Sequence, residues 1–358
     1  MTDETLCSIV LSMVPRLTLQ QRCTLLREQG SAVGAVDTPL VRERLSGVHA
    51  RAEEEMRWAE EHGVQCVGFY DERYPRRLRE CCDAPVVLYV LGKADLNAAR
   101  VLTVVGSRHI TDYGRRLCEN IVGGLSEKSP GTLIVSGLAY GVDVCAHRAA
   151  LHGGLPTVGV LAHGLDRIYP TAHRQTAKQM VEGGGALLTE FPHGTNMEKG
   201  YFVQRNRIVA GAADASLIVQ AARRSGSMVT ANLTNSYDRE LYACPGRIGD
   251  EQSEGCNWLI RTQRAHMMFT VDDFMEEMNW SCELLRSQTL KAGVQQELFP
   301  SFSDEEQRVV NALRDADEMH INDIAKNTGL PVHSLAAVLF SLEMRGVVRQ
   351  LSGGRYSM

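Results

Sequence analysis

Residues 132–143 read TLIVSGLAYGVD, an apolar run that passes into a glycine-containing loop and then into a helical stretch. Six more short apolar runs stand between turns and helical segments, at Val86–Val90, Val101–Val105, Thr157–Leu161, Ala186–Leu188, Ser216–Val219 and Leu241–Ala243. Near-continuous apolar strands that alternate with helices are typical of a parallel sheet covered on both faces. The pattern predicts an α/β domain with a doubly wound parallel sheet over residues 63–280.

The segment before this domain has a different texture. Residues 1–62 carry apolar positions at helical spacing, with Gly30, Gly34 and Pro39 as breaks between the periodic stretches. This pattern predicts a small N-terminal helical domain of the SAM or helix–hairpin–helix type. Nothing in its sequence is diagnostic of DNA binding, and a packing role is the favoured interpretation.

The segment after the sheet domain is also separate. Residues 281–301 contain Gly293 and Pro300 and predict a linker. Ser303 and Glu306 then have the spacing of a capping box. Three helical segments and two short strands around a tight turn follow, at Glu305–Leu313, Ile321–Thr328, Val332–Arg345, 346–350 and 353–356. Three helices and a hairpin predict a winged helix over residues 302–358.

Composition narrows the class of protein. The chain has 358 residues and a formal net charge of −5, so a polyanion would need a local basic patch. Its ten cysteines form no CxxC pair, which argues against a zinc site. Neither a signal peptide nor an apolar run of membrane-spanning length is present in the sequence. These features predict a cytoplasmic protein with reduced thiols and no metal.

Candidate binding residues gather in loops that follow the predicted strands, where helix N-termini offer N–H groups to anions. The loop after Val101–Val105 carries an arginine, a forked cation, two positions after a glycine. The loop after Thr132–Val135 contains a glycine turn, and two arginines follow Thr157–Leu161. The loop after Ser216–Val219 carries small hydroxyl donors. In chain order these candidates are Gly106, Ser107, Arg108, Ser136, Gly137, Gly141, Arg167, Arg174, Ser225, Gly226 and Ser227. Each loop also has a purely structural interpretation, and only their combination favours an anion site.

The stretch from Lys199 to Gly211 is the most basic of these loops. Lys199 and Phe202 precede an Arg205-Asn206-Arg207 triplet at the start of an apolar helix. Residues 197–247 hold seven basic and four acidic side chains, so this middle section is positive within an acidic chain. The two arginines point about 200° apart on a helix. We therefore expect one of them to face a ligand while the other, with Asn206, ties neighbouring loops together.

Several enzyme classes are disfavoured. The second loop lacks a GxGxxG fingerprint and its ribose-binding acid, which argues against nicotinamide chemistry. The loop at Ser225 has no P-loop lysine, which argues against ATP hydrolysis. Asp143 and His147 are four residues apart on a predicted helix, close enough to pair, but such a pair needs no catalysis to explain it.

The order of these motifs resembles the DNA-processing protein DprA (Smf) family. The resemblance covers about residues 64–270 and rests on VGSR at 105–108, SGLAYGVD at 136–143, GLD at 164–166, YP at 169–170, RNR at 205–207 and SGS at 225–227. The segment 302–356 also resembles the C-terminal module of many members. Gln220 departs from the family, which usually has Glu at that position.

The resemblance implies a non-catalytic protein with an extended Rossmann-like core. It implies that this core binds single-stranded DNA, dimerises, and loads the RecA recombinase in natural transformation and recombination. Arg108 matches the family arginine implicated in DNA contact, and Lys199 resembles a lysine that precedes the RNR motif. No cofactor is implied.

Two other functions stay open. The architecture resembles cytokinin-activating phosphoribohydrolases, which cleave nucleoside monophosphates, but Gln220 replaces the strand-end carboxylate and an amide is no general base. Alternatively, the winged helix recognises a specific duplex DNA sequence, and the protein acts as a regulator. Its predicted recognition helix offers only His333, Ser334 and Arg345, and residues 302–356 hold six basic and eight acidic side chains. A protein-binding or intramolecular role is therefore favoured for this module.

Overall fold

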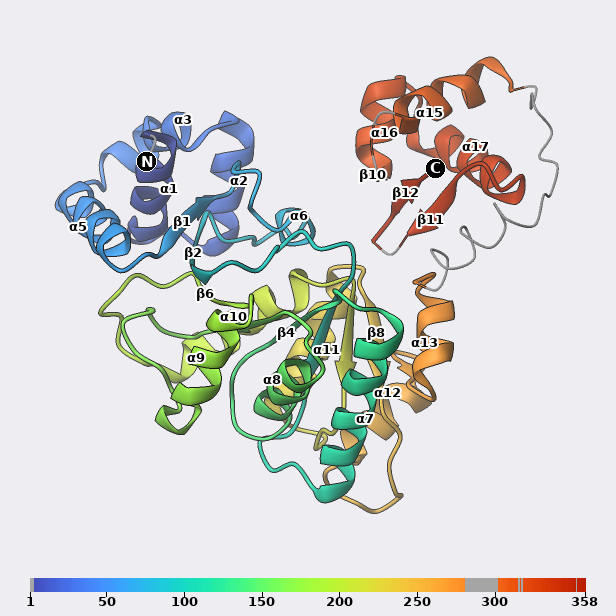
Figure 1. Cartoon of the computed structure of the whole chain (residues 1–358). Helices are drawn as coiled ribbons and strands as arrows, with labels where there is room; N and C mark the ends of the chain where they lie inside the picture. Colours follow the sequence, from blue (N-terminus) through green and yellow to red (C-terminus); the bar gives the residue numbers. More distant parts are fainter. Residues whose placement is uncertain (1–2, 281–301, 315, 317, 352) are drawn as a thin grey trace. The chain divides into compact units, whose positions relative to one another are not determined.

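The computed structural model describes residues 3–280, 302–314, 316, 318–351 and 353–358 (Figure 1). The chain divides into two compact units, Met1–Val271 and Asp272–Met358. The predicted linker 281–301 lies outside the described residues. No helix of the described chain is long and apolar enough to cross a membrane.

A nine-stranded sheet in the order β1-β2-β6-β5-β4-β3-β7-β8-β9 forms the centre of the first unit. Its strands are β1 (Gln65–Gly68), β2 (Val87–Gly92), β3 (Val101–Val105), β4 (Leu133–Ser136), β5 (Thr157–Val160), β6 (Ala186–Thr189), β7 (Ala215–Ile218), β8 (Glu240–Ala243) and β9 (His266–Met267). The predicted doubly wound sheet is confirmed from β6 to β9, where all neighbours run parallel.

The prediction of a parallel sheet is wrong at one edge. Strand β2 pairs antiparallel with both β1 and β6. Most of β2 is buried, so its apolar run looks like that of a parallel strand and carries no information about direction. The sequence analysis also missed β1 and β9; β9 is two exposed residues long and has no burial pattern to detect.

Helices alternate with the strands, as expected for crossover connections. They are α6 (Arg76–Arg79), α7 (Asp112–Lys128), α8 (Val142–His152), the 3-10 turn η1 (Thr171–His173), α9 (Arg174–Glu182), α10 (Lys199–Gly211), α11 (Gly226–Ser236) and α12 (Glu254–Arg261). The next helix, α13 (Val271–Glu277), falls in the second unit apart from its first residue. Chain connections leave β3 toward β4 on one side, while β7 pairs with its other side. This reversal at β3 is the point where open α/β sheets bind ligands.

Residues 1–62 are helical as predicted, in α1 (Asp3–Met13), α2 (Leu19–Gln29), α3 (Ala32–Val36), α4 (Pro39–Arg42) and α5 (Val48–Glu61). Thr18 and Gln21 form a capping box at the start of α2, and Gly30 ends that helix in the left-handed conformation. Buried residues of α1 such as Ile9 and Leu11 join one core with β1 and β2. The helices therefore cover the antiparallel edge of the sheet.

The second unit contains a winged helix, as predicted. Helices α15 (Asp304–Arg314), α16 (Ile321–Thr328) and α17 (Val332–Met344) enclose a core with Val310, Ile324 and Leu339. Strands β10 (Met319–His320), β11 (Arg349–Leu351) and β12 (Arg355–Ser357) form a small sheet, of which β10 was not predicted. The capping box is confirmed, because Ser303 and Glu306 exchange hydrogen bonds of 3.0 and 3.2 Å.

Candidate functional site

The loops that carry the predicted site residues share one edge of the sheet. Strands β6, β5, β4, β3 and β7 are parallel neighbours, so their carboxyl ends meet at the same edge. We call the loops after β3, β4, β5 and β7, together with the start of α10, the rim. Twelve of the sixteen sequence-predicted residues belong to the rim or to the first turns of its helices; Ser136 is the last residue of β4, and Arg205, Asn206 and Arg207 lie in the middle of α10.

The loop after β3 is anchored by backbone hydrogen bonds. Ser107 N–H donates to the Gln220 carbonyl at 2.7 Å, and Val142 N–H donates to the Ser107 carbonyl at 3.1 Å. The Ser107 hydroxyl is buried and donates to Gln252 Oε1 at 2.5 Å. Ser107 is therefore committed to the fold, while the next residue, Arg108, is exposed.

Glycines let the rim loops approach one another closely. Gly141 has a φ of 80°, and a Cβ there would collide with the Ser107 carbonyl and the Arg108 backbone. Gly137 lies against the Arg205 guanidinium, where a Cβ would also collide. Gly106 packs against Val142. These close approaches hold the loops after β3 and β4 as one surface.

An exposed cation and an aromatic pair meet above these loops. The Arg108 guanidinium lies 5.8 Å from the centre of the Phe202 ring, and Tyr169 meets the same ring edge-on at 6.0 Å. Lys199 is exposed and lies three residues before Phe202 on α10, hence on a neighbouring part of the helix surface. Within the described residues, neither cation has a carboxylate partner, so both charges are available to a ligand.

Two further arginines differ in how far their charge is neutralised. Arg174 is exposed at the first turn of α9 and has no carboxylate partner in the described chain. The preceding residue, His173, hydrogen-bonds the Leu138 carbonyl at 2.8 Å, which fixes this helix start beside the loop after β4. Arg167, by contrast, forms an ion pair with Asp166 at 2.7 Å.

Arg205 lies beneath the rim, with its side chain buried. Its guanidinium is buried against Gly137 and donates to the Val160 carbonyl. Burial lowers the pKa of Arg205 to about 10, while the nearby Asp143 carboxylate opposes that shift. Burial also raises the pKa of Asp143. The pair is a buried support for the loop after β4.

Arg207 is buried as well, on another side of α10. It forms an ion pair with Glu190 and donates to the Asp83 carbonyl. The expectation that one of the two arginines faces a ligand therefore disagrees with this structure, since each guanidinium points into the protein. Asn206, between them, donates to the Gly226 carbonyl at 3.4 Å and ties α10 to the start of α11 as expected.

The remaining predicted donors are small and locally satisfied. The Ser136 hydroxyl is buried and donates to the Val104 carbonyl at 2.6 Å. The hydroxyls of Ser225 and Ser227 lie 3.0 Å apart, in contact with each other. Gly226 is exposed at the first position of α11. The rim therefore presents to a ligand its exposed cations together with the exposed Tyr140 and Tyr169 rings and the half-buried Phe202 ring.

His147 does not pair with Asp143, contrary to the sequence-based expectation. Its Nδ1 lies 2.7 Å from the Thr157 hydroxyl, and the side chain is completely buried. Burial lowers the pKa of His147 to about 3, and the nearby Arg205 and His173 act in the same direction. The imidazole is neutral and inaccessible to any ligand at the rim.

Gln220 connects the loops after β3 and β7. Its Oε1 accepts from Thr111 N–H at 3.0 Å, and its Nε2 donates to the Thr111 hydroxyl at 3.0 Å. The side chain is buried and lies against Gly114. An amide in this place positions the start of α7 and cannot accept a proton as a general base.

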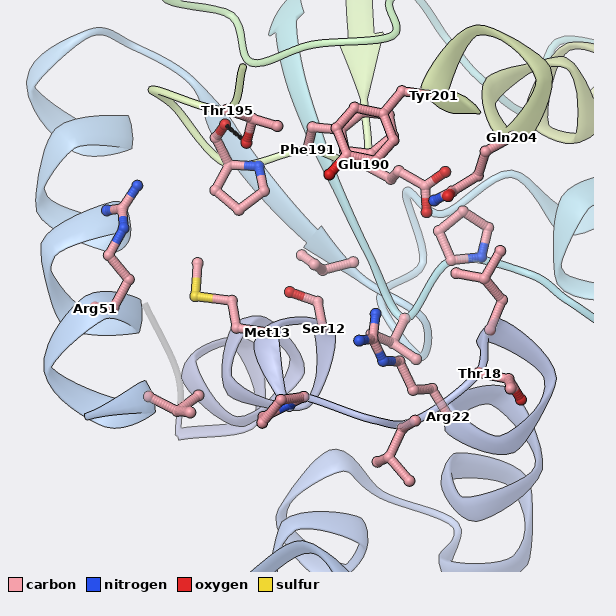
Figure 2. Close-up of a pocket in the computed structure, with 18 of the residues that line it drawn as sticks. Ser12, Met13, Thr18, Arg22, Arg51, Glu190, Phe191, Thr195, Tyr201 and Gln204 are labelled. Carbon is pink, nitrogen blue, oxygen red and sulfur yellow. Dashed lines mark hydrogen bonds between the residues drawn. The ribbon is translucent and has the colours of Figure 1, made fainter. Parts of the chain in front are cut away.

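Sequence reasoning missed a large cleft beside the rim. A cavity of about 1220 Å³ lies between α1, α2 and α5 on one side and the ends of β2 and β6 with α10 on the other (Figure 2). Its lining includes Arg22, Glu190, Phe191, Tyr201 and Gln204. These residues share no motif and meet only in three dimensions, so the sequence carried no signal for the cleft.

Comparison with known proteins gives concordant results. A family model described as DNA recombination-mediator protein A matches residues 65–279, and a DprA winged helix domain model matches residues 295–354. Protein Smf of Escherichia coli is 33% identical over 304 residues, covering 83% of this chain and 78% of its own. The DNA processing protein DprA of Streptococcus pneumoniae is 36% identical over 210 residues, covering 59% and 73%.

Solved structures agree with the sequence matches. An X-ray structure of DprA from Streptococcus pneumoniae superposes with a TM-score of 0.60 at 31% identity, covering 77% of this chain and 93% of that one. DprA from Helicobacter pylori superposes with a TM-score of 0.54 at 29% identity, covering 63% and 96%. The Helicobacter pylori protein is described as having a unique single-stranded DNA binding mode.

Proposed function

Because this chain belongs to the DNA-processing protein DprA (Smf) family, we propose that it binds single-stranded DNA along the rim of its sheet. The observation that carries the proposal is a pair of exposed cations, Arg108 and Lys199, which have no carboxylate partner among the described residues; Arg108 lies over the half-buried Phe202 ring, and Lys199 lies one helical turn before it. The single-stranded DNA binding described for the Helicobacter pylori relative supports the same class of ligand.

The chemistry of the rim fits an unpaired strand. Arginine and lysine bind phosphates, and an aromatic face stacks on any base that is not already stacked in a duplex. Among the described residues, no base-specific donor set accompanies Phe202 on the rim, so sequence preference should be weak. Three unpaired cations, Arg108, Arg174 and Lys199, predict a slope of about −2 for log affinity against log salt, at about −0.7 for each phosphate neutralised.

The finer role follows from the family resemblance. We infer that the bound strand is protected and passed to the RecA recombinase during natural transformation and recombination, and that the protein acts in the cytoplasm as a homodimer through residues 63–280. Residues 1–62 and 302–358 would be accessory domains. The excess of acidic residues in 302–356 supports a protein-binding role for the winged helix over duplex reading.

The proposed role is non-enzymatic. The strand-end position that would hold a catalytic carboxylate carries Gln220, and the buried His147 is neutral and out of reach of the rim. Release of free adenine from AMP, measured by chromatography and abolished by Gln220→Ala, would contradict this view.

Titration of labelled single- and double-stranded oligonucleotides across salt concentrations tests the proposal. We expect preference for the single strand, with Arg108→Ala and Lys199→Ala each weakening it. Arg116→Ala is a matched control, because Arg116 is exposed on α7, beyond the first turn of that helix. Equal affinity in the parent and both rim variants, all folded by circular dichroism, would show that the strand binds elsewhere.

A further inference from the structure

The cleft between the N-terminal helices and the sheet has the properties of a built binding site. Its volume of about 1220 Å³ is large enough for a nucleotide, and both of its walls belong to the compact unit Met1–Val271. Figure 2 shows polar side chains from both walls reaching into the open space. The cations of the rim do not line this cleft.

Glu190 is the least explained residue in the cleft. Its side chain is only 8% exposed, and its Oε2 forms an ion pair with Arg207. Its Oε1 is buried and has no hydrogen-bond partner among the described residues. A buried carboxylate oxygen without a donor is costly, because it has lost its water and gained nothing in exchange. An N–H or O–H donor from a ligand in the cleft would remove this cost.

The opposite wall of the cleft holds a hydrogen-bond donor that lacks an acceptor. Arg22 donates one N–H to the Val14 carbonyl at 2.8 Å, but its buried Nε has no partner in the part of the chain described. Burial lowers the pKa of Arg22, and the Glu190 carboxylate opposes that shift. Gln204, on the same wall as Glu190, adds an amide that can both donate and accept a hydrogen bond.

An aromatic pair completes the cleft. Phe191 and Tyr201 lie 4.5 Å apart with their planes 35° from parallel. Tyr201 and Gln204 are three residues apart on α10, so a flat group against the Tyr201 ring would present its edge near the Gln204 amide. A flat ligand with a donor and an acceptor on one edge meets all of these groups.

We propose that this cleft binds the base of a nucleotide, with an exocyclic amino group of the base donating to Glu190 Oε1 and a ring nitrogen accepting from Gln204 or Arg22. Adenine and cytosine carry such an edge. Thymine does not, because its single N–H lies between two carbonyl oxygens, one of which would face the Glu190 carboxylate. A lysine-bearing peptide would satisfy Glu190 as well, but its charge would be repelled by the nearby Arg22 and Arg207.

The base can come from a free nucleotide or from a bound strand, and the two sources are separable. The inference goes beyond the proposed function, because strand binding at the rim requires none of the cleft residues. The source matters because α10 presents Lys199 and Phe202 to the rim and Tyr201 and Gln204 to the cleft. The rim and the cleft therefore share α10, and a base of a strand bound at the rim would reach the cleft by crossing this one helix.

Isothermal titration of the full chain with dAMP, dCMP and dTMP tests the proposal. We expect dAMP and dCMP to bind at least tenfold more tightly than dTMP, and Gln204→Leu to remove that preference. Gln179→Leu is the matched control, an exposed glutamine on α9 with no place in the cleft. Glu190→Gln is a second variant for the same comparison of dAMP, dCMP and dTMP, provided that its circular dichroism shows a folded chain.

Oligonucleotides of deoxyadenosine and deoxythymidine form the second arm. If mononucleotides are silent but the adenine strand binds more tightly than the thymine strand, and Gln204→Leu equalises them, the base comes from the strand and the proposal stands. Absence of any base preference in both arms overturns it. Lys199→Ala should weaken strand binding while leaving dAMP binding intact, so a failure of the cleft and a failure of the rim give different results.

Discussion

Arg108 and Arg207 belong to two of the motifs that carry the family resemblance, yet they occupy opposite environments. Arg108 is exposed, lies over an aromatic ring, and keeps its charge available. Arg207 is buried against Glu190 and the Asp83 carbonyl. Two arginines of neighbouring motifs therefore differ in role: Arg108, in the exposed contact layer, keeps its charge available for the proposed ligand, whereas Arg207, in the buried layer, holds the loops in place.

Arg207→Ala is the most severe test of this division. It would leave the buried Glu190 carboxylate without its cation, which costs about 3–5 kcal/mol of the free energy of unfolding. Urea denaturation of the purified chain measures this. Arg108→Ala should change stability by less than about 0.5 kcal/mol, since an exposed side chain is lost. A stable Arg207→Ala variant that fails to bind DNA would place Arg207 in the contact layer.

The stability of the folded chain should also depend on pH, through the buried His147. His147 has a pKa of about 3 in the folded chain against about 6.5 when unfolded, so between these values the unfolded state binds more protons. Stability is therefore retained above about pH 6.5 and falls on acidification toward pH 3, by about 1.4 kcal/mol for each pH unit.

Urea midpoints measured from pH 7 to pH 4 reveal this slope, and His147→Gln should flatten it. His152→Gln is a matched control, because His152 is exposed at the end of the same helix. An unchanged slope in His147→Gln would mean that acid sensitivity arises elsewhere.

The contact layer should show its effect in binding instead of stability. Arg108→Ala would remove the proposed phosphate contact and the cation over the Phe202 ring, for which we expect about a tenfold lower affinity for poly-dT, near 1.4 kcal/mol. The salt slope should become shallower by about 0.7. Fluorescence anisotropy at several salt concentrations measures both quantities. A weaker affinity with an unchanged slope would point to a lost stacking contact without a lost phosphate contact.

Sequence reasoning recovered much of this arrangement because its signals are local. The apolar runs and the turns after them placed most of the strands, and the capping box at Ser303 placed the start of α15. Since parallel strands bring their carboxyl ends together, the rim loops could be assigned to one edge of the sheet from the order of the motifs alone.

What the sequence did not reveal depends on contacts between distant segments. The direction of β2 follows from its pairing with β6, which no residue of β2 encodes. The burial of Arg205 and Arg207 depends on Gly137 and Glu190, each located far away in the chain. Likewise, His147 takes Thr157 instead of Asp143 as its partner because β5 passes beside α8.

Two arginines on the rim should show the smallest difference in DNA affinity. Arg174 and Arg167 are both exposed, but Arg167 already pairs with Asp166 at 2.7 Å. A phosphate that binds Arg167 must compete with this carboxylate, and the net local charge it meets is close to zero. We expect Arg167→Ala to change poly-dT affinity by less than about twofold, and Arg174→Ala to shift the salt slope by up to about 0.7.

Asp166→Asn is a further test of the same prediction, because it frees the Arg167 charge and should strengthen binding at low salt. Equal losses in Arg167→Ala and Arg174→Ala would mean that local pairing does not decide which rim cations meet the strand.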